Sequence, residues 1–146
     1  MKKYELTEET FTINENQALY RIKALKDFSD VKAGDLGGYV ESEKNLSQED
    51  DCWIYDKAKV YGSAGIYMDS TVSNYAQVFG SALVFGNARI YGSAEVSGSA
   101  LVYDSALVYG SAEVSGSARV YGESQVYGDA KVYGSAKVFD SAQVYG

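Results

Sequence analysis

A six-residue repeat runs through the chain from Cys52 to Gly146 and keeps one register to the last residue. The first place of each hexad is Ala in most repeats and Cys or Ser in the rest, and the third place is always Val or Ile. Repetition of this kind constrains the fold strongly, because every repeat must adopt the same local structure and stack on its neighbours. A disordered Gly-rich segment has no reason to place a β-branched residue at every sixth position. The pattern therefore indicates an ordered solenoid.

Alternation within each hexad predicts which side chains face inward. Alternate residues of a strand point to opposite sides, so the first and third places should face the core and the second and fourth the solvent. The fifth place is mostly Gly, which fits a turn with positive φ, and Asp or Asn tolerates the same backbone where it replaces Gly, as at Asp56, Asn74, Asp104 and Asp140. Met68 fits this place poorly. The pattern therefore predicts a distortion between Ile66 and Val72.

The number of hexads in one coil follows from a longer repeat. The segments Tyr91–Val102 and Tyr109–Val120 are near copies, and their starting points are three hexads apart. Three hexads per coil make a triangular prism whose coils stack at the inter-strand spacing of about 4.8 Å.

These hexads resemble those of the hexapeptide-repeat family, in which an aliphatic residue is followed four places later by a small one. The resemblance implies an all-β fold, a single-stranded left-handed parallel β-helix, and its handedness comes from the resemblance alone. A second resemblance is to the YdcK-type proteins of bacteria and phages, which join a similar N-terminal segment to a hexapeptide rod and carry a transferase label. It rests on Asp30–Gly34, Gly37–Val40, Asn45–Gln48 and Cys52–Asp56.

The N-terminal part of the chain lacks the repeat, and we expect it to cover the first coil. Thr10–Ile13 and Ala18–Ile22 alternate well enough for two strands of a β-hairpin. The predicted division is a hairpin and loop cap over residues 1–37 and a β-helix over residues 38–146. The step from Leu46 to Ile54 is longer than one hexad, so a two-residue insertion is expected within Ser47–Asp51. This acidic insertion resembles a solvated loop more than a metal site.

Composition narrows the partners. The net charge of −7 disfavours direct binding to nucleic acid or to an anionic membrane, and most of the surplus lies before Ala58. One cysteine cannot form an internal disulfide. The first residues lack the apolar stretch of a signal peptide, and no apolar run is long enough to span a bilayer. A cytoplasmic protein is expected.

The outward places predict binding surfaces. Folding the hexads in threes puts leucine and aromatic side chains on one face of the prism, in a patch of the kind that marks an interface. The chain also stops in register without a capping segment, so we expect either a second copy stacked on the last coil or a fragment of a longer chain. The expected interface residues are Leu83, Phe85, Leu101, Tyr103, Tyr121, Phe139, Val144 and Tyr145.

The resemblance to hexapeptide-repeat proteins makes the histidine content informative, because acyltransferases of that family generally use a histidine as general base and carbonic anhydrases of the same fold bind zinc through three histidines. The chain has no histidine, so we predict that it is not an enzyme, with no catalytic residue, cofactor or metal site. Cys52 occupies an inward place, which favours a buried structural thiol over a nucleophile. Glu95 and Glu113 lie one coil apart, and a solvated polar face explains them better than an acid–base pair.

The resulting hypothesis is a non-catalytic, self-associating β-helical scaffold or binding protein, related to phage proteins by the resemblance above. Its interfaces would be the aromatic faces and the last coil, and its first expected partner is another copy of itself. One alternative is an acidic inhibitor that mimics nucleic acid and binds a basic site on a partner protein. A further alternative is a glycan-binding module that uses the aromatic faces.

Overall fold

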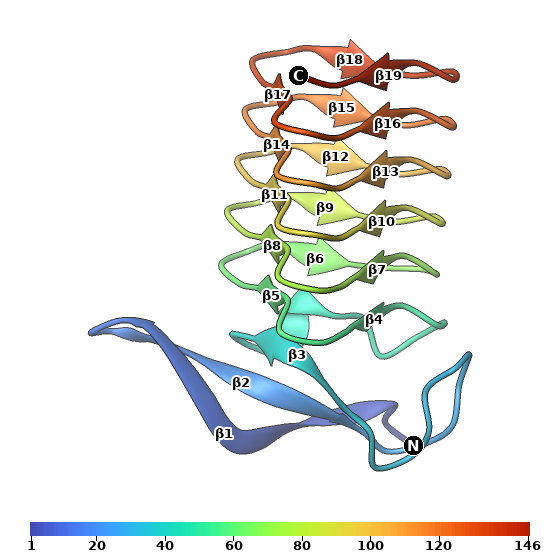
Figure 1. Ribbon diagram of the computed structural model, residues 1–146. Coiled ribbons are helices and arrows are strands. Elements are labelled where there is room, and N and C mark those ends of the chain that lie inside the picture. Colours follow the sequence, from blue (N-terminus) through green and yellow to red (C-terminus); the bar gives the residue numbers. More distant parts are fainter.

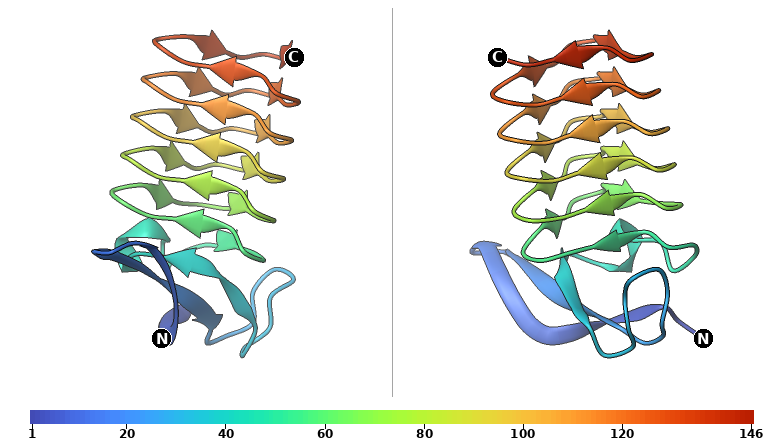
Figure 2. Two further views of the ribbon diagram at one scale, coloured as in Figure 1. Left: turned by 60° about the vertical axis from the view of Figure 1, so that its left-hand side comes forward. Right: turned by 45° about the vertical axis from the view of Figure 1, so that its right-hand side comes forward.

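The computed structural model describes residues 1–146 as a three-sided rod of about six coils, standing on an N-terminal hairpin (Figure 1). The coils wind in a left-handed sense, with parallel strands stacked along each side (Figures 1 and 2). The only helical segment is a short 3-10 turn, η1 (Glu43–Asn45). The predicted all-β, left-handed parallel β-helix with an N-terminal hairpin is confirmed.

Three sheets form the sides of the rod. The first side, which we call the leucine–aromatic face, contains β6 (Gly65–Ile66), β9 (Leu83–Val84), β12 (Leu101–Val102), β15 (Arg119–Val120) and β18 (Lys137–Val138). The second, the tyrosine face, contains β4 (Trp53–Ile54), β7 (Thr71–Val72), β10 (Arg89–Ile90), β13 (Leu107–Val108), β16 (Gln125–Val126) and β19 (Gln143–Val144). The third, the glutamate face, contains β5 (Lys59–Val60), β8 (Gln77–Val78), β11 (Glu95–Val96), β14 (Glu113–Val114) and β17 (Lys131–Val132).

From β4 to β16, each strand of the rod pairs with the strand three hexads farther along the chain, so one coil contains three hexads, as predicted. Leu101 of β12 lies between Leu83 of β9 and Arg119 of β15 in the parallel register. The amide of Leu83 donates to the carbonyl of Ala100 at 3.0 Å, and this bond recurs one coil higher from Leu101 to Ala118 at 3.0 Å. Hydrogen bonds between coils therefore pair the backbone N–H and C=O groups of the strands, although each strand has only two residues.

The interior contains the small and β-branched places of the hexads. Val102, Val120 and most of their equivalents are fully buried, together with the alanines of the first place. Ser70 and Ser124 replace Ala inside, and each hydroxyl donates to the carbonyl three residues before it, at 2.6 and 2.7 Å. The core is thus a column of methyl and isopropyl groups whose two buried serine side chains are both hydrogen-bonded.

The turns have the positive φ that the sequence predicted, but the distortion predicted near Met68 is absent. Asp56, Asn74, Asp104 and Asp140 all have φ between 55° and 58°. Met68 has φ 59°, and the pairing on either side of it continues without a shift. The predicted distortion near Met68 is therefore wrong: the coils above and below impose the left-handed turn, and the Met side chain is accommodated because it is exposed, at 52%.

The N-terminal hairpin extends one side of the rod. Strands β1 (Tyr4–Asn14) and β2 (Gln17–Ala24) are antiparallel and longer than the sequence pattern indicated. β2 pairs with β3 (Leu36–Val40), which in turn lies parallel to β5 of the glutamate face. Figure 2 shows the hairpin crossing the base of the coils. The predicted division after residue 37 falls within β3.

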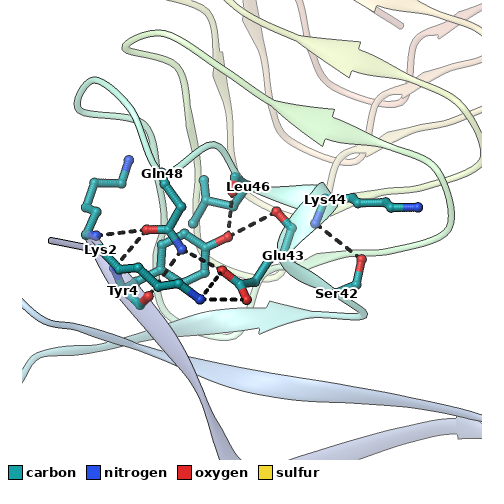
Figure 3. A network of polar contacts seen from close by, with 8 residues as sticks. Lys2, Tyr4, Ser42, Glu43, Lys44, Leu46 and Gln48 are labelled. Atoms are coloured by element: carbon teal, nitrogen blue, oxygen red, sulfur yellow. Dashed lines mark hydrogen bonds and ion pairs between the residues drawn. The ribbon is translucent and has the colours of Figure 1, made fainter.

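Side chains of the hairpin and its loop cover the base of the core. Trp53 of β4 is 1% exposed, because Tyr4 and Phe28 pack edge-on against its ring at centroid distances of 6.1 and 5.2 Å. Tyr4 donates to the carbonyls of Leu46 and Glu43, and Gln48 links the first strand to the same loop (Figure 3). These contacts fix the cap against the first coil.

The predicted two-residue insertion is present. Leu46 pairs in parallel with Ile66, a step that exceeds three hexads by two residues. The extra residues lie in the loop between Leu46 and Cys52, and the regular register begins after it. No helix in the structure is long and apolar enough to span a membrane.

Candidate binding faces and cleft

The leucine–aromatic face brings six of the predicted interface residues together. Three ring pairs stack along it, with centroid separations of 4.9 Å for Phe85–Tyr103, 5.0 Å for Tyr103–Tyr121 and 5.5 Å for Tyr121–Phe139. Beside these rings, Leu83 lies directly below Leu101. Both leucines are partly exposed. The face is therefore a continuous strip of apolar side chains that the chain itself does not cover.

The other two predicted interface residues lie elsewhere. Val144 is the last strand residue of β19, on the tyrosine face, and is partly exposed. Tyr145 stacks on Tyr127 at 5.3 Å and is 67% exposed. Tyr145 is the top ring of a different ladder and Val144 packs against the end of the core, so the eight predicted residues do not make one surface.

The tyrosine face is a second ladder with a gap in it. Tyr91, Tyr109, Tyr127 and Tyr145 stack at centroid distances of 4.8, 5.0 and 5.3 Å. The hydroxyl of Tyr109 also donates to Gln125 of the next coil, at 2.8 Å. One coil below Tyr91 the equivalent residue is Ser73, and Tyr55 occupies this place in the coil below that. The ladder therefore lacks one ring.

A polar cleft of about 680 Å³ lies where this ring is missing. Its floor is the tyrosine face from Tyr55 to β13, and its lower rim comes from the N-terminal loop and the acidic insertion. The side chains that line it are mostly polar: Ser29, Asp30, Asp51, Tyr55, Asp69, Thr71, Ser73, Asn87, Arg89, Tyr91 and Leu107. A volume of this size lies within the range of about 300–1,000 Å³ typical of small-molecule sites.

The lower rim of the cleft is held by specific contacts. Tyr55 donates to Asp30 Oδ1 at 2.6 Å. Burial, and then this hydrogen bond to Asp30, raises the pKa of Tyr55, which keeps the phenol protonated. Phe28 and Val31 exchange backbone bonds of 3.0 and 2.7 Å, so the turn that carries Asp30 is closed. The segment that forms the lower rim is therefore held in place by hydrogen bonds and by its packing in the cap.

Charged groups enter the cleft from both sides. Asp69 Oδ1 accepts from the amide of Asp51 at 3.2 Å, which places these two carboxylates one coil apart. Arg89, on β10, is exposed and forms none of the three ion pairs of the structure. Asp30 is the third carboxylate of the lining, and Arg89 supplies the one guanidinium. The cleft therefore has both hydrogen-bond acceptors and donors, and its net charge is negative.

Sequence reasoning missed this cleft. Ser73 is visible in the sequence as the break in the tyrosine series, and that break was the available signal. The position of Asp30 could not be predicted, because it depends on how the loop from Ala24 to Leu36 folds back against Trp53.

The backbone of the acidic insertion binds the ammonium group of Lys3. Lys3 is 1% exposed, and its ammonium donates to the carbonyls of Glu49, Asp50 and Cys52 at 3.2, 3.1 and 2.8 Å. Burial lowers the pKa of Lys3 and raises the pKa of the Cys52 thiol. Cys52 is fully buried, as predicted, and a raised pKa disfavours the thiolate that a nucleophile needs.

The glutamate face presents its carboxylates as predicted. Glu95 and Glu113 are direct partners in β11 and β14. No group of three or more His, Cys, Asp or Glu side chains lies close enough together to bind a metal ion.

Comparison with known proteins supports the fold and changes the functional interpretation. No family model matches the chain. The chain is 41% identical over 81 residues to a protein of Escherichia coli (strain K12) described as "Uncharacterized acetyltransferase YdcK". The match covers 50% of this chain and 25% of that protein, so the chain spans about a quarter of the length of this relative.

The prediction that the chain is not an enzyme is contradicted by this relative, whose name assigns acetyl transfer. The prediction rested on the absence of histidine. Histidine is the most common general base, but a carboxylate or a phenol can also accept or relay a proton. The likeness to YdcK and the β-solenoid together support a hexapeptide-repeat β-helix whose activity a missing histidine does not decide.

Proposed function

We propose that this chain is a self-associating β-helical binding module, and that the leucine–aromatic face packs against the same face of a second copy. The observation that carries the proposal is the uncovered strip of Leu83, Phe85, Leu101 and Tyr103 at the centre of that face. Contiguous apolar patches of this kind usually mark interaction sites on globular proteins.

The geometry of the strip supports pairing with itself. Its strands repeat at one spacing and its rings are parallel, with interplanar angles of 1° for both Phe85–Tyr103 and Tyr103–Tyr121. Such a face is flat along the rod, and a flat face matches a copy of itself related by a two-fold axis. The charged residues of this side, Arg119 and Lys137, lie above the central strip and leave it uncharged.

The size of the strip predicts a weak complex. Its apolar area is on the order of several hundred Å², whereas a stable specific interface buries about 800 Å² per partner. We therefore expect a monomer–dimer equilibrium that depends on concentration, and not a permanent dimer.

Light scattering and sedimentation equilibrium over a wide concentration range test the proposal. The double variant Leu101→Glu/Tyr103→Glu should remain monomeric where the wild type associates, because two charges in the strip would lose their hydration on pairing. The matched control is Leu107→Glu/Tyr109→Glu, the same change on the tyrosine face, which should associate like the wild type. A wild type that stays monomeric at every concentration, or equal effects of both variants, would refute the proposal.

Acetyl transfer is the second candidate, and the likeness to YdcK over half the chain favours it. In this reaction an amine or hydroxyl attacks the thioester carbonyl and gives its proton to a base, and the thiol of the donor leaves. The Asp30–Tyr55 pair in the cleft offers a carboxylate and a phenol, 2.6 Å apart, for the proton transfer.

The assay for this candidate is thiol release from acetyl-coenzyme A in the presence of a panel of amines and alcohols. A general base contributes about 10²–10⁴-fold to a rate, so release by the wild type that falls at least about tenfold in Asp30→Asn supports this candidate. Release no faster than in buffer, or equal release by wild type and Asp30→Asn, would exclude acetyl transfer at this pair.

A further inference from the structure

We infer that the cleft at the missing ring of the tyrosine ladder is a binding site for a neutral saccharide. The inference does not depend on self-association, which uses a different face. It does not depend on acetyl transfer either, because a saccharide can bind here whether or not the protein uses an acetyl donor. It starts from one substitution in the repeat: Ser73 stands where the coils below and above have Tyr55 and Tyr91.

The gap has room for a sugar ring. Tyr55 and Tyr91 are two coils apart, which is about 9.6 Å along the rod at the inter-strand spacing of about 4.8 Å. Elsewhere on this face a tyrosine ring fills each step of 4.8 to 5.3 Å. The space at Ser73 is therefore the space of one ring. A pyranose is a flat, six-membered ring whose C–H surface packs against aromatic side chains, which are apolar on their faces.

The polar groups around the gap match hydroxyls better than they match an ion. Asp51 and Asp69 present acceptors, Arg89 presents donors, and Asn87 and Thr71 supply both kinds. A sugar hydroxyl donates one hydrogen bond and accepts others, so it can satisfy both sets at once. Hydrogen bonds to charged groups are the stronger kind in such contacts.

The charge balance and the composition of the lining disfavour anionic and hydrophobic ligands. Three carboxylates and one guanidinium leave the cleft with a net negative charge, which disfavours phosphate, sulfate or a nucleotide. The lining has three apolar residues out of 11, too few for a hydrophobic ligand. A guanidinium or ammonium ligand would be attracted by the three carboxylates and repelled by Arg89, and such a ligand leaves the donors of Arg89 unused. A neutral ligand with many hydroxyls can use the carboxylate acceptors and the Arg89 donors together.

The rim of the cleft is rigid enough to bind without reorganisation. Tyr55 is fixed by its bond to Asp30, and Asp69 by its bond from the Asp51 amide. Preorganised polar groups avoid the entropy cost of ordering a loop when the ligand arrives. The cap and the rod together therefore make this site, and neither part makes it alone.

Titration of the full chain with free methyl glycosides of common neutral pyranoses and with N-acetylglucosamine, followed by NMR, tests the inference. Inorganic phosphate, ethylamine and free arginine form the control panel. We expect a saccharide to shift the signals of Thr71, Ser73 and Tyr91, and the control ligands to leave them unchanged. If no saccharide shifts these signals, or if phosphate or an amine shifts them instead, the inference is wrong.

Three variants separate binding from folding. Ser73→Tyr restores the missing ring, so it should abolish saccharide binding while the melting temperature stays equal or rises. Tyr91→Ala should weaken binding at least about tenfold. Tyr127→Ala, a ring of the same ladder outside the cleft, is the matched control and should bind like the wild type. Wild-type binding by Ser73→Tyr, or equal losses in Tyr91→Ala and Tyr127→Ala, would overturn the assignment.

Discussion

Lys3 shows how a single residue can close an irregular part of a regular fold. The two-residue insertion leaves the carbonyls of Glu49, Asp50 and Cys52 without partners from a neighbouring coil, and the buried ammonium of Lys3 donates to all three. The contact to Cys52 is buried and the other two are partly buried, and a buried carbonyl without a partner costs about 1–3 kcal/mol. This residue therefore joins the first strand to the first coil through the backbone.

Lys3→Met is expected to lower the free energy of unfolding by about 3 kcal/mol, because three carbonyls lose one shared donor. Urea denaturation measures this change. Lys2→Met is the matched control: Lys2 is exposed and pairs with Glu43 at 3.1 Å, and an exposed ion pair contributes about 0–1 kcal/mol. Equal effects of the two substitutions would show that the buried ammonium does not hold the loop.

The buried Tyr4 should make the free energy of unfolding depend on pH in the alkaline range. Burial raises its pKa above the ordinary value of 10.0, so in the unfolded chain Tyr4 loses its proton at a lower pH than in the folded one. The stability linked to this difference is complete below pH 10 and is lost as the pH rises above it. Tyr4→Phe should be about 1–2 kcal/mol less stable at neutral pH, because its hydrogen bonds to Leu46 and Glu43 are lost.

The difference in unfolding free energy between the wild type and Tyr4→Phe should therefore shrink above pH 10, the ordinary pKa of a tyrosine. Denaturant titrations at a series of pH values from neutral to alkaline measure it. A difference that stays constant across that range would contradict the assignment of alkaline destabilisation to Tyr4.

At the scale of the element, each turn is limited by the coil next to it. Gly98 has φ 65°, and a Cβ at this position would lie 2.8 Å from the backbone N and O of Gly116 in the next coil. Gly134 has the same φ of 65°, but no atom lies within 4 Å of the place that its Cβ would take. The two glycines therefore separate the cost of the backbone conformation from the cost of the close approach.

Gly134→Ala should cost about 1–2 kcal/mol, the penalty of a left-handed conformation for a residue with a Cβ. Gly98→Ala should cost about 1–3 kcal/mol more, since the neighbouring coil must move as well. Thermal and urea unfolding of the two variants measure the difference. Equal destabilisation would show that the coils are not packed as closely as the structure has them.

The elements also show what was predictable from the sequence. The inward Val and Ala, the coil of three hexads and the left-handed turns at Asp56 and Asn74 were predictable, because each depends on the repeat alone. The turn at Met68 was predicted wrongly, since its conformation is imposed by neighbouring coils. The contacts of Lys3 and the cleft were not predictable, because they join segments that are far apart in the sequence or depend on a folded-back loop.

For the whole molecule, the three faces of the rod share one backbone and differ in their outward side chains, so each face is suited to a different partner. The two proposals use different faces: a second copy would pack on the leucine–aromatic face, and a saccharide would bind in the cleft of the tyrosine face, while the glutamate face presents carboxylates. The part of the acetyltransferase-named relative that matches this chain is a quarter of that protein. Because the faces point in different directions, neither proposal requires the other to fail, and the two can be tested independently.

Thiol cross-linking tests the central proposal, self-association through the leucine–aromatic face, most directly. In a Cys52→Ala background, Leu101→Cys and Leu107→Cys place one thiol on consecutive strands of two different faces. Under mild oxidation Leu101→Cys should form a disulfide-linked dimer that grows with protein concentration, while Leu107→Cys should remain monomeric. Equal cross-linking of both variants, or none from Leu101→Cys at concentrations where the wild type associates, would contradict the account.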